Sequence, residues 1–196
     1  IATSTRRPNC GFARIRAASI GAPVAIGGTT RYAAITASGD RTCGRALDGA
    51  AFCWGRSWVG IAGTANGFRT QSTPLRVPGM LAFRSLEAGA STTCGVSLDD
   101  QAYCWEANFL GTIGDGTAAP SQSPQPVIGG RVLLSVRSGA VQTCGIDDSG
   151  YAFCWGAGSR GELGTSPTLL HTRCGESELP CARVPVRVSG WRQFSA

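Results

Sequence analysis

The chain has 196 residues, of which 42% are hydrophobic and only 15% are charged, and this length is typical of one domain with a sizeable core. Its 28 glycines keep no three-residue period, which excludes collagen, and the composition is unlike that of a disordered tail or a coiled coil. No apolar run reaches the roughly 18 to 20 residues that a membrane-spanning helix requires. We therefore expect a single domain over residues 1–196 without a membrane span.

The formal net charge is +6, and all 18 basic residues are arginine. A basic balance is compatible with nucleic-acid binding. The arginines, however, are scattered from Arg6 to Arg192 without a basic run or interleaved aromatic residues, whereas a nucleic-acid interface needs its basic residues on one face. Nucleic acid is therefore not an expected partner.

Six of the nine cysteines form three pairs that share one internal spacing of ten residues. The pairs are Cys43 with Cys53, Cys94 with Cys104, and Cys144 with Cys154. Successive pairs recur at intervals of 51 and 50 residues. The first cysteine of each pair lies in a Thr-Cys-Gly motif and the second in an aromatic-Cys-Trp motif. A fixed period of this length is typical of propellers and solenoids.

Each cysteine pair encloses a segment with the Asp and Gly residues of a tight turn, such as Leu47-Asp48-Gly49. Each pair therefore closes a predicted β-hairpin, in which opposite residues lie close enough for a disulfide. Zinc is the alternative, but zinc ligands usually include histidine and cysteines two to four residues apart, and His171 is the only histidine. We predict three cross-strand disulfides.

Further segments of each repeat predict additional strands. A short apolar segment that ends at a glycine precedes each hairpin, and a glycine-rich turn follows it. A proline-marked segment then closes the repeat, at 74–77, 124–128 and 185–188. Four short antiparallel strands per repeat are the content of one propeller blade. We expect repeats over approximately 31–81, 82–131 and 132–190, with partial repeats at 1–30 and 191–196, so that the all-β chain forms about three and a half to four blades of an incomplete propeller.

This pattern resembles the regulator-of-chromosome-condensation (RCC1-like) repeats over residues 32–196. The resemblance rests on the glycine-ended strand, the Thr-Cys-Gly hairpin, the aromatic-Cys-Trp-Gly strand and the Gly-x-Leu-Gly turn, which is cleanest at Gly161 to Gly164. Two positions depart from it: Glu106 replaces the glycine after Trp105, and the first turn reads Gly60-Ile61-Ala62-Gly63. The resemblance implies a β-propeller, commonly of seven blades, and the cysteine-paired hairpin is similar to that of secreted bacterial members.

The two ends of the sequence match parts of a fourth repeat without its hairpin. Trp191 and Phe194 match the start of a first strand, and Pro23 to Gly27 match a closing strand. A propeller needs about four to eight blades to close its ring, and open strand edges pair with other chains. The sequence begins at Ile1 rather than methionine. We therefore expect either that copies of the chain complete one another, as a ring or a fibre, or that it is part of a longer propeller.

Three cysteines remain after the hairpin pairs are assigned. Cys174 and Cys181 lie in one loop and are predicted to form a fourth disulfide. Cys10 is left over, and an odd cysteine in a secreted protein indicates an intermolecular bond; a free buried thiol is the alternative. Four disulfides indicate an oxidising compartment, so we expect an extracellular or cell-surface protein, and the resemblance implies a bacterial one.

No catalytic or metal-binding constellation is recognisable, and neither a cofactor nor an enzyme activity is expected. His171 lies in a polar loop, and no Gly-x-Ser-x-Gly motif is present. The acidic pairs Asp99-Asp100 and Asp147-Asp148 lie at hairpin turns, where aspartate caps its own backbone more often than it binds calcium. Tryptophans recur at one blade position, where we favour packing between blades over a carbohydrate-stacking surface: Trp54, Trp105 and Trp155.

Two non-enzymatic functions follow from these expectations. The first is a structural subunit that assembles with its own copies outside the cell. The second is a soluble secreted propeller, or a fragment of a seven-bladed one, that binds or inhibits another protein through its loop face, as does a secreted β-lactamase inhibitor of similar fold. Eukaryotic members of the family exchange nucleotide on a small GTPase and bind chromatin, but a disulfide-rich chain is out of place in the nucleus.

Overall fold

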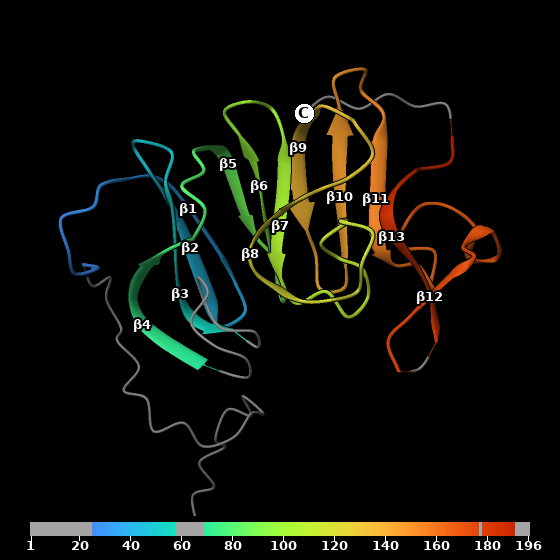
Figure 1. The fold of residues 1–196 in the computed structure, drawn as a ribbon, viewed down its shortest axis with the longest axis horizontal. Coiled ribbons are helices and arrows are strands. Elements are labelled where there is room, and N and C mark those ends of the chain that lie inside the picture. Colours follow the sequence, from blue (N-terminus) through green and yellow to red (C-terminus); the bar gives the residue numbers. More distant parts are fainter. Residues whose placement is uncertain (1–24, 58–68, 177, 191–196) are drawn as a thin grey trace, which may run out of the picture.

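The computed structural model describes residues 25–57, 69–176 and 178–190 of the chain. The described residues form 13 β-strands and one short 3-10 helix, Pro167–Leu169. The strands make three antiparallel sheets, called blades 1, 2 and 3 below, which lie side by side in chain order (Figure 1). The prediction of an all-β chain built from incomplete-propeller blades is confirmed.

Each blade contains four strands in chain order, and blade 3 has one more at its edge. Blade 1 consists of β1 (Tyr32–Ser38), β2 (Arg41–Ala46), β3 (Ala51–Ser57) and β4 (Arg69–Arg76). Blade 2 consists of β5 (Phe83–Ala88), β6 (Thr92–Ser97), β7 (Ala102–Glu106) and β8 (Ser121–Pro126). Blade 3 consists of β9 (Leu133–Ser138), β10 (Gln142–Asp147), β11 (Ala152–Ala157), β12 (Thr172–Cys174) and β13 (Leu179–Arg187).

Aspartate side chains cap the hairpin turns of blades 1 and 3, as the sequence predicts, whereas in blade 2 Ser97 Oγ accepts from the backbone N–H of Gln101 and Asp100 forms an ion pair with Arg84. In blade 1, Asp48 Oδ1 accepts a hydrogen bond of 3.0 Å from the backbone N–H of Ala50. In blade 3, Asp147 Oδ1 accepts one of 2.8 Å from the backbone N–H of Tyr151. These carboxylates satisfy backbone donors of the turn and thereby stabilise the hairpin.

At the tryptophan of each third strand the register with the last strand shifts, because the last strand has extra residues opposite that tryptophan. The residues directly after the three tryptophans, where pairing resumes, are Gly55, Glu106 and Gly156. Gly55 and Gly156 have φ of 101° and 103°, in the left-handed region that glycine enters without steric cost. Glu106 has φ of 86°, which for a residue with a Cβ stores roughly 1 to 3 kcal/mol of strain.

Blade 3 departs from the predicted four strands. β12 pairs with the beginning of β13, with Thr172 opposite Cys181 and Cys174 opposite Leu179. The polar loop that the sequence left without structure therefore forms an extra edge hairpin, and the Cys174–Cys181 disulfide joins its two strands.

The last strand of every blade begins earlier than its proline predicts. β4 begins at Arg69, β8 at Ser121 and β13 at Leu179, several residues before the segments marked by proline. Proline is tolerated in β4 and β8 because an outer strand needs no N–H donor on its open side, and Pro185 of β13 lies beyond the residues that pair with β12. Ala25, Ile26 and Gly27, part of a predicted closing strand, are not in a strand; Pro23, Val24 and residues 191–196 lie outside the described residues.

The hydrophobic core lies between the blades. One cluster packs Trp105 of blade 2 against the Cys43–Cys53 disulfide of blade 1, and a second packs Trp155 of blade 3 against the Cys94–Cys104 disulfide of blade 2. Each interface is therefore formed by the tryptophan-bearing face of one blade and the disulfide-bearing face of the blade before it.

Candidate functional site

All four predicted cysteine pairs form disulfides in the structure: Cys43–Cys53, Cys94–Cys104, Cys144–Cys154 and Cys174–Cys181. The first three join residues that lie directly opposite each other across the central hairpin. Their Cα atoms are 4.0 to 4.1 Å apart, a separation that antiparallel pairing itself provides. Cys10 lies outside the described residues.

The three tryptophans occupy equivalent positions but differ in burial. Trp105 and Trp155 are fully buried, each with 0% of its surface exposed. Trp54 is only half-buried, and it packs against Tyr32 of its own blade with ring centroids 5.9 Å apart. The difference arises because none of the described strands packs on the side of blade 1 where Trp54 lies.

We call this side of blade 1 the Trp54 face, made of Tyr32, Ile35, Ala37, Phe52 and Trp54. Ile35 lies opposite Gly44, as Val136 lies opposite Gly145 in blade 3. Ile35 is 55% exposed, whereas Val136 is 3% exposed. The Trp54 face thus carries the residue types of a blade interface, but it is uncovered in the described part of the chain.

The other end of the row of blades presents the disulfide side of blade 3. We call it the Cys144 face, made of Arg137, Cys144, Cys154 and Val186, which are opposite one another across four strands. Cys144 is half-buried, whereas the equivalent Cys43 and Cys94 are fully buried. No described blade covers the Cys144 face.

A buried ion pair crosses the interface between blades 1 and 2. Glu106 is fully buried, Arg41 is 3% exposed, and the guanidinium of Arg41 contacts Glu106 Oε2. Thr93 Oγ1 donates a hydrogen bond of 2.9 Å to the same oxygen, and Arg41 also donates to the backbone carbonyl of Gly89. Burial raises the pKa of the Glu106 carboxyl, although the charge of Arg41 and the Thr93 hydrogen bond act in the opposite direction.

Sequence reasoning missed this ion pair, although Glu106 was visible as a departure from the repeat. The equivalent positions at the interface between blades 2 and 3 hold Thr92 and Gly156, as the hairpin registers show. The charged pair therefore belongs to one interface alone among the described blades.

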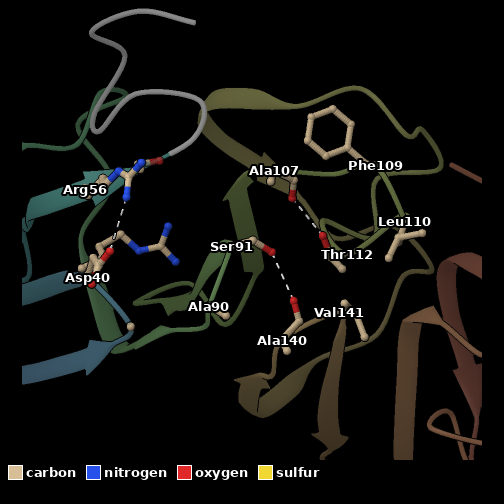
Figure 2. Close-up of a pocket in the computed structure, with 13 residues that line it drawn as sticks. Asp40, Arg56, Ala90, Ser91, Ala107, Phe109, Leu110, Thr112, Ala140 and Val141 are labelled. Atoms are coloured by element: carbon tan, nitrogen blue, oxygen red, sulfur yellow. Dashed lines mark hydrogen bonds and ion pairs between the residues drawn. The ribbon is translucent and has the colours of Figure 1, made fainter. Parts of the chain in front are cut away.

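A hollow of about 530 Å³ opens on the side where the turns between first and second strands meet (Figure 2). Small and apolar residues form much of its lining, among them Ala90, Ala107, Leu110, Ala140 and Val141. At its margin Arg56 and Asp40 form an ion pair of 3.9 Å, and Ser91 Oγ donates to the carbonyl of Ala140 at 3.3 Å. The hollow has room for an apolar side chain, and the lining residues include neither histidine nor cysteine.

Other candidate groups lie apart from these features. His171 is exposed in the loop before β12, and Asp147 caps its hairpin turn. The described residues contain no group of three or more His, Cys, Asp or Glu that could hold a metal ion. Nor do they include a helix of the length and apolar character needed to cross a membrane.

Comparison with known proteins gives structural likeness only. No family model matches the sequence, and no curated protein matches it. Human WBSCR16 matches with a TM-score of 0.64 and 18% identity, over 82% of this chain and 40% of that one. Prp20p from Saccharomyces cerevisiae, the yeast RCC1, matches with a TM-score of 0.53 and 13% identity, over 85% of this chain and 53% of that one.

The chain has an RCC1-like propeller fold. It spans about half or less of the length of the structures it matches. At these identities the likeness concerns the fold, and a propeller fold hosts many functions.

Proposed function

We propose that the chain is an extracellular, non-enzymatic protein of the secreted bacterial, cysteine-paired type of RCC1-like repeat, and that it assembles with further copies of itself into a fibre or a ring. The observation that carries this proposal is the uncovered Trp54 face. The equivalent residues of blades 2 and 3 are largely buried, at the interfaces between blades 1 and 2 and between blades 2 and 3.

The hydrophobic effect supplies the driving force. Each Å² of apolar surface removed from water contributes about 25 cal/mol, and Ile35 and Trp54 expose such surface side by side with Phe52 and Tyr32. Contiguous apolar patches of this kind mark interaction surfaces more often than isolated exposed residues do. Covering the Trp54 face with another blade restores the environment that Trp105 and Trp155 already have.

The four disulfides support the extracellular location, because such bonds persist in oxidising compartments. Cys10 is proposed as the site of a covalent bond between copies, since the other eight cysteines are paired.

Sedimentation velocity over a concentration series tests the assembly. Ile35 and Leu98 are exposed aliphatic residues of similar accessibility, 55% and 65%, but only Ile35 lies on the Trp54 face. We expect the unmodified chain to form larger species as its concentration rises, Ile35→Arg to remain monomeric, and Leu98→Arg to behave as the unmodified chain. A chain that stays a 20.2 kDa monomer throughout the micromolar range would refute the proposal.

A second function is supported by the hollow on the loop side, which would receive an apolar side chain of another protein. In this function the chain is a soluble propeller, or part of one, that binds or inhibits a partner. Prp20p, of similar fold, binds Gsp1p and histones. The expected pattern is then a monomeric chain whose partner binding is lost in Ala140→Arg, which fills the hollow, and is retained in Ile35→Arg.

A further inference from the structure

We infer that the copies associate head to tail, with the Trp54 face of one copy packed on the Cys144 face of the next in the register of the internal blade interfaces. This inference rests on the proposed self-assembly and names the two surfaces that meet. In this inference, a second copy of the chain covers the Trp54 face.

At both internal interfaces, the first strand of one blade contacts the same position on the first strand of the blade before it. At the first, the backbone N–H of Ala88 donates a hydrogen bond of 3.1 Å to Thr36 Oγ1. At the second, Arg137 donates one of 2.9 Å to Glu87 Oε2. Thr36 lies opposite Cys43 and Glu87 lies opposite Cys94, so the acceptor position on the disulfide-bearing face is the same at the two interfaces, although the donors, Ala88 and Arg137, are one register position apart.

At both interfaces a tryptophan packs against the disulfide of the blade before it, although the polar contacts beside it differ. Thr93, next to Cys94 and opposite Trp105, has its hydroxyl 3.8 Å from Cys43 Sγ of the blade before. Trp155 and Thr143 of blade 3, which are likewise opposite each other, both donate to the carbonyl of Thr112 in blade 2, at 2.9 and 3.0 Å. A tryptophan-bearing face thus meets a disulfide-bearing face at both interfaces.

The same positions can be located on the two uncovered faces. Arg137 lies opposite Cys144, as Thr36 lies opposite Cys43. Ala37 lies opposite Thr42, as Ala88 lies opposite Thr93. In the inferred contact, Arg137 of one copy therefore lies beside Ala37 of the next.

The charges at the two faces agree with this pairing. Where the first interface holds Arg41 and Glu106, the inferred contact holds Gln142 of one copy and Gly55 of the next, by the register of the hairpins. Neither residue is charged, so this position of the contact leaves no buried charge without a partner, which would cost several kcal/mol. Arg137, the charged residue of the Cys144 face, is paired with Glu87. Because the two faces differ, the contact is heterologous and continues as a fibre unless its rotation closes a ring.

Mixed cysteine variants test the inference. Ala37 is exposed and the Arg137 side chain is 73% exposed, so neither substitution should prevent folding. Ala37→Cys and Arg137→Cys are made in separate, differently tagged copies, mixed, oxidised gently and mapped as non-reduced peptides. We expect a disulfide between residues 37 and 137 in the mixture, and little when either variant is mixed with the control Leu98→Cys.

The outcomes separate this inference from the proposed function. A dominant link of Ala37→Cys to itself, or equal linking to Leu98→Cys, in chains that still assemble would overturn the head-to-tail contact and leave self-assembly standing. Absence of any association by sedimentation would overturn both. A second readout needs no new cysteine: assembly should slow reduction of Cys144–Cys154 relative to monomeric Ile35→Arg, and equal rates in the two would also overturn the contact.

Discussion

Glu106 forms a buried ion pair with Arg41 of the neighbouring blade, at the position after the tryptophan where the other two blades have glycine. A buried pair of this kind is costly to break from one side, because the remaining charge stays in an apolar interface without its partner. Replacing both members by neutral residues is far less costly. The difference in cost between a single and a double replacement can therefore be measured at the interface between blades 1 and 2.

Glu106→Gly should destabilise the chain although it restores the residue of blades 1 and 3. The loss of the counter-charge to Arg41 costs about 3 to 5 kcal/mol, and relief of the positive φ returns about 1 kcal/mol of it. We expect the free energy of unfolding to fall by about 2 to 4 kcal/mol in urea titrations.

The control is the double variant Arg41→Thr with Glu106→Gly, which copies the Thr92 and Gly156 arrangement of the next interface. It should recover most of the lost stability. A double variant no more stable than Glu106→Gly alone would show that the charges do not interact in the folded chain.

The pH dependence of stability should report on Glu106. Burial raises its pKa in the folded chain above the ordinary value of 4.5, so between these two values the folded state binds more protons than the unfolded state. Its contribution to stability is then complete below the unfolded value and is lost as the pH rises through the folded value. The free energy of unfolding, relative to Glu106→Gln, should decline over this interval; a rise instead would show that the Arg41 charge dominates over burial.

The equivalent tryptophans should differ in their contribution to stability. Trp155→Ala removes a fully buried ring whose Nε1 donates to the carbonyl of Thr112, and we expect a loss of about 3 to 5 kcal/mol. Trp54→Ala removes a half-buried ring from an uncovered face, and in the dissociated chain the loss should be about 1 to 2 kcal/mol. Equal losses at low concentration, measured by chemical unfolding, would mean that the Trp54 face is already covered.

The hairpin disulfides should be reduced in an order that follows their burial. Thiol–disulfide exchange requires access to a sulfur atom, and Cys144 is half-buried whereas both cysteines of the other two hairpins are fully buried. In the dissociated chain under native conditions, Cys144–Cys154 should therefore react before Cys43–Cys53 and Cys94–Cys104. Timed alkylation with peptide mapping measures the order, and simultaneous reduction of all three would contradict it.

The repeat period and the cysteine spacing were sufficient to predict blades, hairpins and disulfides. These features are local: Cys43 and Cys53 face each other because one short turn joins their strands, and the same pattern recurs twice. The Asp48 turn was predictable for the same reason, since the side chain caps a backbone N–H two residues away.

Features that depend on the neighbouring blade were not predictable. Trp54 and Trp155 share one sequence motif, but their burial depends on whether another blade covers them. The partner of Glu106 is Arg41, far away in the sequence, and only packing of two sheets brings the charges together. β12 was missed because three residues without alternation carry no strand pattern, and its pairing with β13 depends on the loop that the Cys174–Cys181 bond closes.

The Arg41–Glu106 pair also constrains how a gene for such a chain can lengthen. A tandem duplication of blade 2 would place a second Glu106 against Thr92, leaving a buried carboxylate without an arginine. A duplication of blade 3 would place Gly156 against Gln142, which strands no charge. By this argument a copy of blade 3 strands no charge whereas a copy of blade 2 does, so one salt bridge limits which of the otherwise similar repeats can be duplicated.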